Sequence, residues 1–406
     1  MQRTIGLAVW LGFIAVGVCD SAEMVSVTDL AGVVSTGRLQ SWSLDRLQLT
    51  GESPRDFARA EIRSVHFDRP GKRLTRTMQT TPTIWLSNGD QISARAISAD
   101  ENFVTASWSL LGEGEPTPIP LEKVVAIVFE WPLDPQERLR LIADLETIPK
   151  GNDVVLLTNG DRFSGEFERF EAAHLQLKVG PNSLKLDRSR VRALRFNPEL
   201  TTLVRPQDRR SCLTFDDGSH LTVSECELVD ETLQVQSGFM GKRSLPVHHL
   251  LACHLFGERV IPLADREPTK VEFTPYLSVQ WPLVRNANVR RGPLTLRGIE
   301  FVTGLGMHSR MAVTYPLKGS EQEFRATVGI DDLAGGGGSV RFGVDLDGER
   351  VWTSAELKGD TAAVKIPVIK LQGHQQLTLV VDYGEFADVL DYADWCDAVL
   401  IVDPVP

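Results

Sequence analysis

"GIDDLAGGGGSVRFGVDLDG", residues 329–348, holds four consecutive glycines, Gly335 to Gly338, between two runs that alternate apolar and polar side chains. A flexible linker would be flanked by polar, low-complexity sequence, whereas "FRATVGI" and "VRFGVDL" flank these glycines. A phosphate-binding loop would lead into a helix N-terminus, and here a strand pattern follows. The stretch therefore predicts a tight loop between two strands of a folded β domain.

The sequence around this loop continues the same pattern. Short alternating segments such as "ERVWTSAEL", "QQLTLVVDY" and "WCDAVLIVD" are separated by turns such as "DLDGE" and "KLQGH". Such segments are typical of a sandwich of two antiparallel sheets. We therefore expect a β-sandwich over residues 268–406.

Four blocks of this segment carry a family resemblance. "GLGMHS" (304–309), the glycine stretch, "LTLVVD" and "DYADWCDAVL" (391–400) occur in the order found in the NPCBM/NEW2 domain, a carbohydrate-binding module found beside glycosidases and in secreted multidomain proteins. The family is similar in fold to galactose-binding-like jelly rolls, whose edge loops bind sugars and often hold a structural Ca²⁺. The resemblance implies a noncatalytic glycan-binding function for this module.

The blocks also suggest which residues would contact a sugar: His308, Asp332, Tyr392, Asp394 and Trp395. Imidazole and carboxylate groups hydrogen-bond to hydroxyls, and an indole offers an apolar face to a sugar ring. A purely structural interpretation is open for each, with Trp395 in the core and Asp332 capping its loop.

Two further features of the blocks bear on this expectation. A structural Ca²⁺ would lie near Asp331 and Asp394, because carboxylate oxygens are preferred Ca²⁺ ligands. The family pattern usually has His at the position of Tyr392 and a small residue at that of Cys396, which puts an inherited sugar specificity in question.

The first two-thirds of the chain contains a repeat. "IWLSNGDQISARAI" (84–97), "VLLTNGDRFSGEFE" (155–168) and "CLTFDDGSHLTVSE" (212–225) each place Asn-Gly or Asp-Gly between alternating apolar residues, a signature of β-hairpins. A closing pattern follows in "IRSVHF" (62–67), "VVAIVF" (124–129), "VRALRF" (191–196) and "LACHLF" (251–256), with a small third residue that is Cys253 in the last copy. Four β units are predicted, at 23–70, 81–132, 151–198 and 209–257, and the first is degenerate.

The order of strands expected in one unit weakly resembles that of Sm-like and SH3-like small barrels. Between the second and third units, "DPQERLRLIADLE" (134–146) predicts a helix within a spacer at 133–150, with Asp134 as its N-cap and Pro135 in its first turn. The predicted fold class is all-β: tandem small β-barrel-like repeats followed by a C-terminal jelly-roll β-sandwich.

The N-terminus predicts export. An apolar run at residues 5–18 follows Arg3 and precedes small residues, as in a cleaved signal peptide over residues 1–22. Acylation of Cys19 is the alternative, although Val18 is bulky for a lipoprotein signal. The mature chain would then lie in the periplasm, at the cell surface or outside the cell, without an integral membrane span.

Four cysteines follow the leader, and in an oxidising compartment a disulfide between Cys212 and Cys253 would join the first and last strands of the fourth unit. The cluster "HHLLACH" (248–254) could alternatively hold a metal, but no C-x-x-C pair accompanies it.

The remaining sequence features limit the function class. The formal net charge of -11 disfavours nucleic-acid partners, and no hydrolase or phosphate-loop motif is present. We therefore expect a glycan or surface polysaccharide as partner, with the repeats as a scaffold or protein-binding arm. An envelope structural protein, or a polysaccharide-acting glycoside hydrolase with an unrecognised site, are the alternatives.

Overall fold

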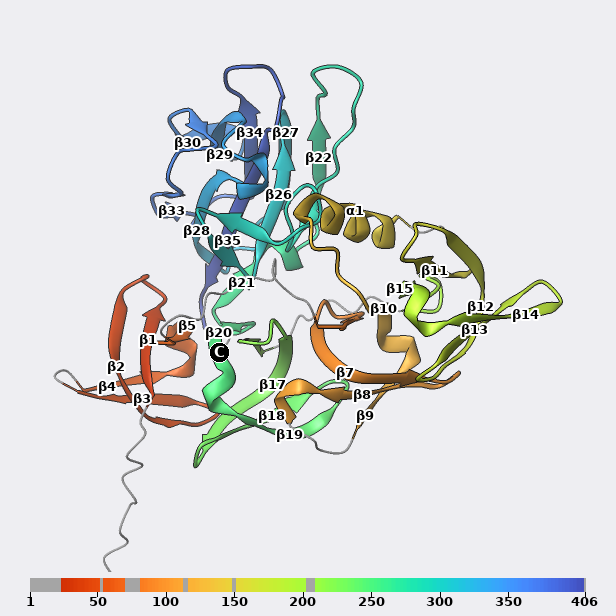
Figure 1. The fold of residues 1–406 in the computed structure, drawn as a ribbon. Coiled ribbons are helices and arrows are strands. Elements are labelled where there is room, and N and C mark those ends of the chain that lie inside the picture. Colours follow the sequence, from red (N-terminus) through yellow and green to blue (C-terminus); the bar gives the residue numbers. More distant parts are fainter. Residues whose placement is uncertain are drawn as a thin grey trace, which may run out of the picture.

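The computed structural model describes residues 23–51, 54–69, 81–111, 116–147, 151–201 and 209–404, so the predicted leader lies outside the described residues. The all-β fold class is confirmed: strands dominate, and α1 (Pro135–Glu146) is the one α-helix among the described residues (Figure 1). No helix in that part of the chain is long and apolar enough to cross a membrane.

The N-terminal part consists of four units of five strands each, and in every unit the first strand pairs with both the second and the fifth. The first unit runs in the order β5-β1-β2-β3-β4. The strands of the first two units are β1 (Met24–Asp29), β2 (Val34–Trp42), β3 (Arg46–Thr50), β4 (Arg55–Ala58), β5 (Ile62–Phe67), β6 (Thr83–Leu86), β7 (Gln91–Ala99), β8 (Phe103–Trp108), β9 (Thr117–Pro120) and β10 (Val124–Val128).

The third and fourth units repeat this arrangement. Their strands are β11 (Asp153–Leu157), β12 (Arg162–Phe170), β13 (His174–Val179), β14 (Asn182–Asp187), β15 (Val191–Arg195), β16 (Arg210–Phe215), β17 (His220–Val229), β18 (Thr232–Ser237), β19 (Gly241–Pro246) and β20 (Leu250–Phe256). The hairpins predicted from Asn-Gly and Asp-Gly are present, with Gly89, Gly160 and Gly218 at positive φ.

The register of the strand pairs corrects the sequence alignment of the fourth unit by one residue. The equivalent pairs are Val27 with Val65, Ile84 with Ile127, Val155 with Leu194, and Leu213 with Cys253. Cys253 therefore occupies the core-facing aliphatic position of the closing strand and is 0% exposed, whereas the small third position is Ala252.

The predicted disulfide between Cys212 and Cys253 is wrong. Cys212 pairs with His254 and Cys253 with Leu213, so the two cysteines are neighbours in register whose side chains lie on opposite faces of the sheet. All four cysteines among the described residues are free thiols. The sequence alignment placed the two residues on the correct strands but could not reveal the face to which each side chain points.

Two seams between closing strands join the units. β10 pairs with β15, which joins units 2 and 3, and β5 pairs with β20, which joins units 1 and 4, in the same antiparallel register. Helix α1 covers the outer face of the first seam, where Leu141 and Leu145 pack on Val128 and Ala193. The C-terminal module lies over the second seam (Figure 1).

Helix α1 begins as predicted. The Asp134 carboxylate accepts a hydrogen bond of 2.9 Å from the backbone N–H of Glu137, and Pro135 occupies the first turn. The buried residues of the helix are Arg138, Leu141 and Leu145, while Leu139 lies against Gly292 of the C-terminal module. The helix thus contacts both the repeat units and the module.

The C-terminal module is a two-sheet sandwich. One sheet runs β23-β26-β35-β28-β32, with β21 beside β35 and β33 beside β28, and the other runs β22-β27-β34-β29-β30, with β31 beside β29. The strands are β21 (Val260–Pro262), β22 (Lys270–Phe273), β23 (Val284–Arg285), β24 (Leu294–Leu296), β25 (Ile299–Phe301), β26 (Gly304–His308), β27 (Met311–Pro316), β28 (Glu321–Ile330), β29 (Ser339–Leu346), β30 (Glu349–Thr353), β31 (Leu357–Lys358), β32 (Val364–Lys365), β33 (Ile369–Lys370), β34 (Gln376–Tyr383) and β35 (Tyr392–Val402).

The four glycines form the tight loop that the sequence predicts. They follow β28 in one sheet and lead into β29 in the other, so the loop carries the chain across the sandwich. Gly335, Gly336 and Gly338 have φ angles of 59°, 88° and 83°, which residues other than glycine rarely adopt. A Cβ on Gly338 would also collide with the carbonyl of Leu390, so this loop packs directly against the loop before β35.

Candidate functional site

An aromatic cluster lies where β26 ends and β35 begins. His308 and Tyr392 are directly paired across these strands, with ring centroids 6.1 Å apart. Trp281, from the segment between β22 and β23, stacks on His308 with ring centroids 4.4 Å apart and planes inclined by 7°. It also lies 5.9 Å from the Tyr392 ring. Three aromatic rings from distant parts of the sequence thus meet at one end of the sandwich.

The exposure of these rings differs. Trp281 and Tyr392 are partly exposed, whereas His308 is 2% exposed because Trp281 covers it. The guanidinium of Arg290, an exposed residue, lies 5.9 Å from the Trp281 ring centroid and adds several N–H donors. The surface that a ligand can reach is therefore made by Trp281, Tyr392 and Arg290, with His308 as the support beneath.

The tautomer of His308 follows from its hydrogen bond. Nδ1 donates to the carbonyl oxygen of Ser309 at 3.0 Å, which leaves Nε2 as the acceptor of a neutral ring. Burial lowers the pKa of His308, because the charged form loses its hydration. The ring is therefore a neutral stacking partner at pH 7 and not a cation.

A buried carboxyl holds the strand ends together behind the cluster. Asp391 accepts hydrogen bonds from the Ser309 hydroxyl and, at 2.8 Å, from the backbone N–H of Ser339. Burial raises its pKa to about 6. Asp391 thus links β26, β29 and β35 next to the aromatic rings, and it fixes their relative positions.

Apolar side chains are exposed on the two loops that lead into Trp281 and Tyr392. Leu277 and Val279 are 79% and 56% exposed before Trp281, and Phe386 and Val389 are 75% and 60% exposed before β35. The two loops are connected, because the Tyr383 hydroxyl donates to the Thr274 carbonyl at 2.6 Å. Exposed apolar side chains on loops next to partly exposed aromatic residues are typical of a binding surface.

Trp395 does not belong to this site. It is 0% exposed and lies between the two sheets, with its ring centroid 5.3 Å from that of Phe342. The strand alternation is the cause, because Tyr392 and Trp395 are three residues apart on β35 and point to opposite faces. The sequence prediction of a sugar-stacking Trp395 is therefore replaced by the core interpretation.

The predicted acidic residues are also separated from the cluster's surface. The Asp332 carboxylate accepts from the backbone N–H groups of Arg297 and Gly298, both at 2.7 Å, and thereby holds the β24–β25 hairpin. Asp394 is 0% exposed, and neither of its carboxyl oxygens accepts a hydrogen bond from a described residue. Burial and the neighbouring Asp331 hold its pKa well above the usual value.

The residues near Asp331 and Asp394 do not fit a Ca²⁺ site. Both Asp331 oxygens are already used, by Asn288 at 3.0 Å, Leu333 at 2.9 Å and Thr295 at 2.9 Å. Of these two carboxyl groups, only that of Asp394 accepts no hydrogen bond from a described residue, whereas Ca²⁺ takes roughly six to eight oxygen ligands. Within the described ranges, no group of three or more His, Cys, Asp or Glu residues is placed to hold a metal ion. We therefore derive no role for calcium here.

Sequence reasoning missed Trp281 and Arg290. Both lie in the segment 274–303, whose strands are only two or three residues long, and no alternating pattern surrounds Trp281. A tryptophan in a polar, proline-containing loop, "VQWPL", is a signal for a functional aromatic residue, because loops seldom bury such a ring completely.

Residues 267–401 match the family model described as "NPCBM/NEW2 domain". The C-terminal module is an NPCBM/NEW2 domain. The resemblance of the four sequence blocks is thus confirmed, and the aromatic cluster lies within the matched residues. The four N-terminal units lie outside them.

Two curated relatives match part of the chain. The chain is 33% identical over 106 residues to a "Putative endo-alpha-N-acetylgalactosaminidase" of Renibacterium salmoninarum, and 34% identical over 108 residues to "Alpha-1,3-galactosidase B" of Akkermansia muciniphila. Each match covers 26% of this chain, but only 7% and 13% of those relatives.

Solved structures of carbohydrate-binding modules match 35% and 64% of the chain. The CBM51 of Clostridium perfringens GH95, solved with methyl-galactose, is 25% identical and covers 35% of this chain and 99% of its own, with a TM-score of 0.32. The tandem CBM51 modules of Sp3GH98 from Streptococcus pneumoniae are 13% identical, cover 64% of this chain and 91% of their own, and have a TM-score of 0.31.

Proposed function

We propose that the NPCBM/NEW2 domain binds a glycan without catalysis, through the surface made by Trp281, Tyr392 and Arg290. The observation that carries this proposal is the partly exposed indole of Trp281, which the buried His308 ring supports at 4.4 Å. An aromatic ring held rigidly at a surface offers an apolar face to the C–H groups of a sugar ring, and it loses little conformational entropy on binding.

Polar groups beside the indole complete the recognition. The Tyr392 hydroxyl both donates and accepts hydrogen bonds, and the Arg290 guanidinium donates to sugar oxygens. The family match supports the glycan as ligand, and the leader-like residues 1–22 support an exported chain that meets glycans outside the cytoplasm. The four repeat units then serve as the scaffold that presents the module.

The test is a glycan array followed by calorimetric titration with the full chain. We expect binding to at least one glycan, at least about tenfold weaker in Trp281→Ala. Phe103→Ala is the matched control, because Phe103 is 44% exposed on β8, outside the module. No retained glycan, or equal affinity in Trp281→Ala, would refute the proposal. Release of reducing sugar from a polysaccharide would instead support a hydrolase.

A further inference from the structure

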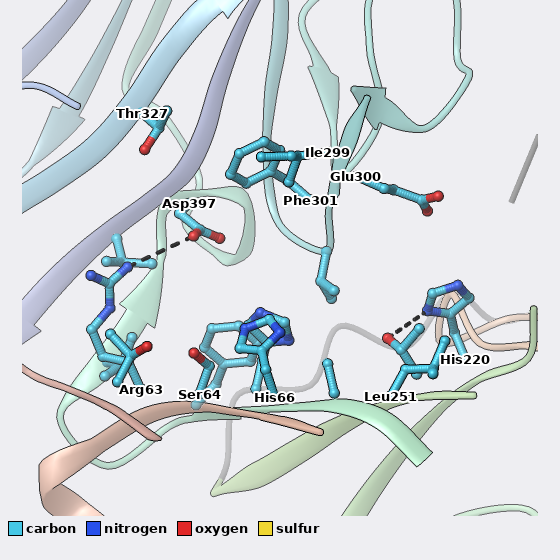
Figure 2. Close-up of a pocket in the computed structure, with 18 of the residues that line it drawn as sticks. Arg63, Ser64, His66, His220, Leu251, Ile299, Glu300, Phe301, Thr327 and Asp397 are labelled. Atoms are coloured by element: carbon cyan, nitrogen blue, oxygen red, sulfur yellow. Dashed lines mark hydrogen bonds and ion pairs between the residues drawn. The ribbon is translucent and has the colours of Figure 1, made fainter. Parts of the chain in front are cut away.

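A cavity of about 370 Å³ lies between the repeat units and the C-terminal module (Figure 2). Its floor is the seam between units 1 and 4, where Ala252 pairs with His66 and His254 with Ser64. Its other wall comes from the module and includes Phe301 on β25. The volume lies within the range of ~300–1,000 Å³ that small-molecule sites occupy.

The equivalent seam shows that this cavity is a specific feature of units 1 and 4. Val128 and Arg195 hold the positions of His66 and His254 in units 2 and 3, and α1 closes that seam. The guanidinium of Arg195 donates to the backbone carbonyls of Leu145 and Val125, at 3.0 and 2.8 Å. The space above the seam between units 2 and 3 is therefore filled by side chains and α1. The space above the seam between units 1 and 4 is a cavity lined by two histidines.

The two imidazoles are neutral hydrogen-bonding groups. The His66 and His254 rings meet edge to face with centroids 5.4 Å apart, and Nδ1 of His254 is buried without a hydrogen-bond partner among the described residues. Burial lowers the pKa of His66 and, together with the positive charges nearby, that of His254 to about 3. Phe256 stacks beside His254, so the floor combines apolar ring faces with polar ring edges.

One end of the cavity is cationic. Arg63 on β5 has a side chain that is only 14% exposed, and it makes no hydrogen bond to a described residue. The Asp397 carboxylate is its closest ion-pair partner, at 3.9 Å, which is too long for a hydrogen bond. Lys365 on β32 adds a second cation, and Asp397 interacts with both charges. Two cations thus share one carboxylate on the cavity wall.

The opposite end carries acceptors. Figure 2 shows Glu300 and His220 on the side of the cavity away from Arg63 and Asp397, with Phe301 and His66 between the two ends. Asp216, which is hydrogen-bonded to His249 at 2.9 Å, also lines the cavity. Carboxylates accept hydrogen bonds from hydroxyl groups, so this end suits the hydroxyl side of a ligand whose other side is an anion.

We propose that this cavity binds an anionic sugar unit, with its carboxylate or sulfate group at Arg63 and Lys365 and its ring between Phe301 and the His66–His254 pair. The oxygens of an anionic group would accept the hydrogen bonds that the N–H groups of the buried Arg63 guanidinium do not make to described residues. The site is separate from the aromatic cluster, because Asp397 follows Tyr392 by five residues on β35, a distance of about 16 Å along the strand. The proposal therefore does not depend on the proposed function of the aromatic cluster.

The test is calorimetric titration of the full chain with three probes: methyl glucuronide, glucose 6-sulfate and methyl glucoside. We expect one of the anionic probes to bind at least about tenfold more tightly than the neutral one, and the better probe identifies the anion. Arg63→Met should weaken that binding at least about tenfold, while Trp281→Ala leaves it unchanged.

Thermal unfolding with and without the better probe provides a second readout. A ligand that binds the folded chain raises its unfolding temperature, and this shift should be lost in Lys365→Met even if Arg63→Met proves unstable. Equal binding of charged and neutral sugars, no binding of either anionic probe, or binding that Trp281→Ala abolishes would each overturn the proposal. A chain that binds neutral glycans on the array but none of these probes keeps the proposed function and loses only this inference.

Discussion

Trp281 lies parallel to His308, with ring planes inclined by 7° and centroids 4.4 Å apart, although the two residues are 27 positions apart in the sequence. The contact buries the imidazole and leaves one indole partly exposed at the end of the sandwich. It follows that Trp281 is the residue on which ligand binding at this surface depends most, whereas His308 acts by holding the indole in place.

Substitutions at His308 should separate these roles. In His308→Ala the indole loses its support, so we expect glycan affinity to fall about tenfold or less, whereas His308→Phe keeps the stacking and should retain most of it. Titration of both variants against the best glycan from the array checks this. A larger loss in His308→Phe than in His308→Ala would show that a polar contact from the imidazole matters more than its stacking.

Trp395 should be required for folding and not for ligand binding. Trp395→Ala removes a fully buried indole from between the sheets and should lower the free energy of unfolding by roughly 3–5 kcal/mol. Trp395→Phe leaves a smaller cavity and should cost less. Denaturant unfolding gives the stability, and titration of the folded Trp395→Phe protein should give wild-type affinity. A selective loss of affinity without a loss of stability would restore Trp395 to the binding site.

Asp394→Asn should stabilise the protein at pH 7. The raised pKa of Asp394 means that the folded chain holds a proton that the unfolded chain releases above about pH 4, so stability is lost as pH rises past that value. The amide removes this cost and can donate to the Asp331 carboxylate. We expect a gain in the free energy of unfolding at pH 7 that vanishes near pH 3, measured by urea unfolding at both pH values. A chelator should leave the unfolding temperature unchanged; a decrease on chelation would instead indicate a bound cation.

His254 should make the fold sensitive to acid. Its pKa of about 3 lies below the unfolded value of 6.5, so between these pH values the unfolded chain binds the additional proton and stability falls as pH decreases. From pH 7.5 to 5.0 this histidine should contribute about 2 kcal/mol of that loss. His254→Leu should remove this contribution when unfolding is measured at the two pH values. If the free energy of unfolding fell by the same amount between pH 7.5 and 5.0 in the wild type and in His254→Leu, this prediction would be wrong.

The cysteines should resist modification in the folded chain. Burial raises the pKa of Cys212 to about 11 and that of Cys253 to about 12, so little thiolate is present at pH 8. We expect iodoacetamide to label these thiols after unfolding but hardly before, as read from the intact mass. A reductant should leave the unfolding temperature unchanged. If the intact mass were lower than expected by the mass of two hydrogen atoms, and a reductant restored it, the chain would contain a disulfide.

The elements of the fold that could be predicted are those set by local patterns. Asn-Gly and Asp-Gly turns between alternating residues predict hairpins because few other residues adopt their backbone angles, and Asp134 with Pro135 predicts where α1 begins. The glycine loop at residues 335–338 follows the same rule. The four sequence blocks were sufficient to predict the NPCBM/NEW2 domain, which the family match then confirmed.

The positions of side chains relative to one another required the tertiary structure. A shift of one residue in the fourth unit moves Cys253 from one face of β20 to the other, and only the strand register shows that His254 faces the module. Trp281 lies in a loop without periodicity, so its stacking on His308 at the end of β26 could not be predicted from a local pattern. The seam between units 1 and 4 is covered by the C-terminal module, which leaves a cavity, whereas α1 packs on the seam between units 2 and 3. No local sequence pattern predicts which element packs on the outer face of a sheet.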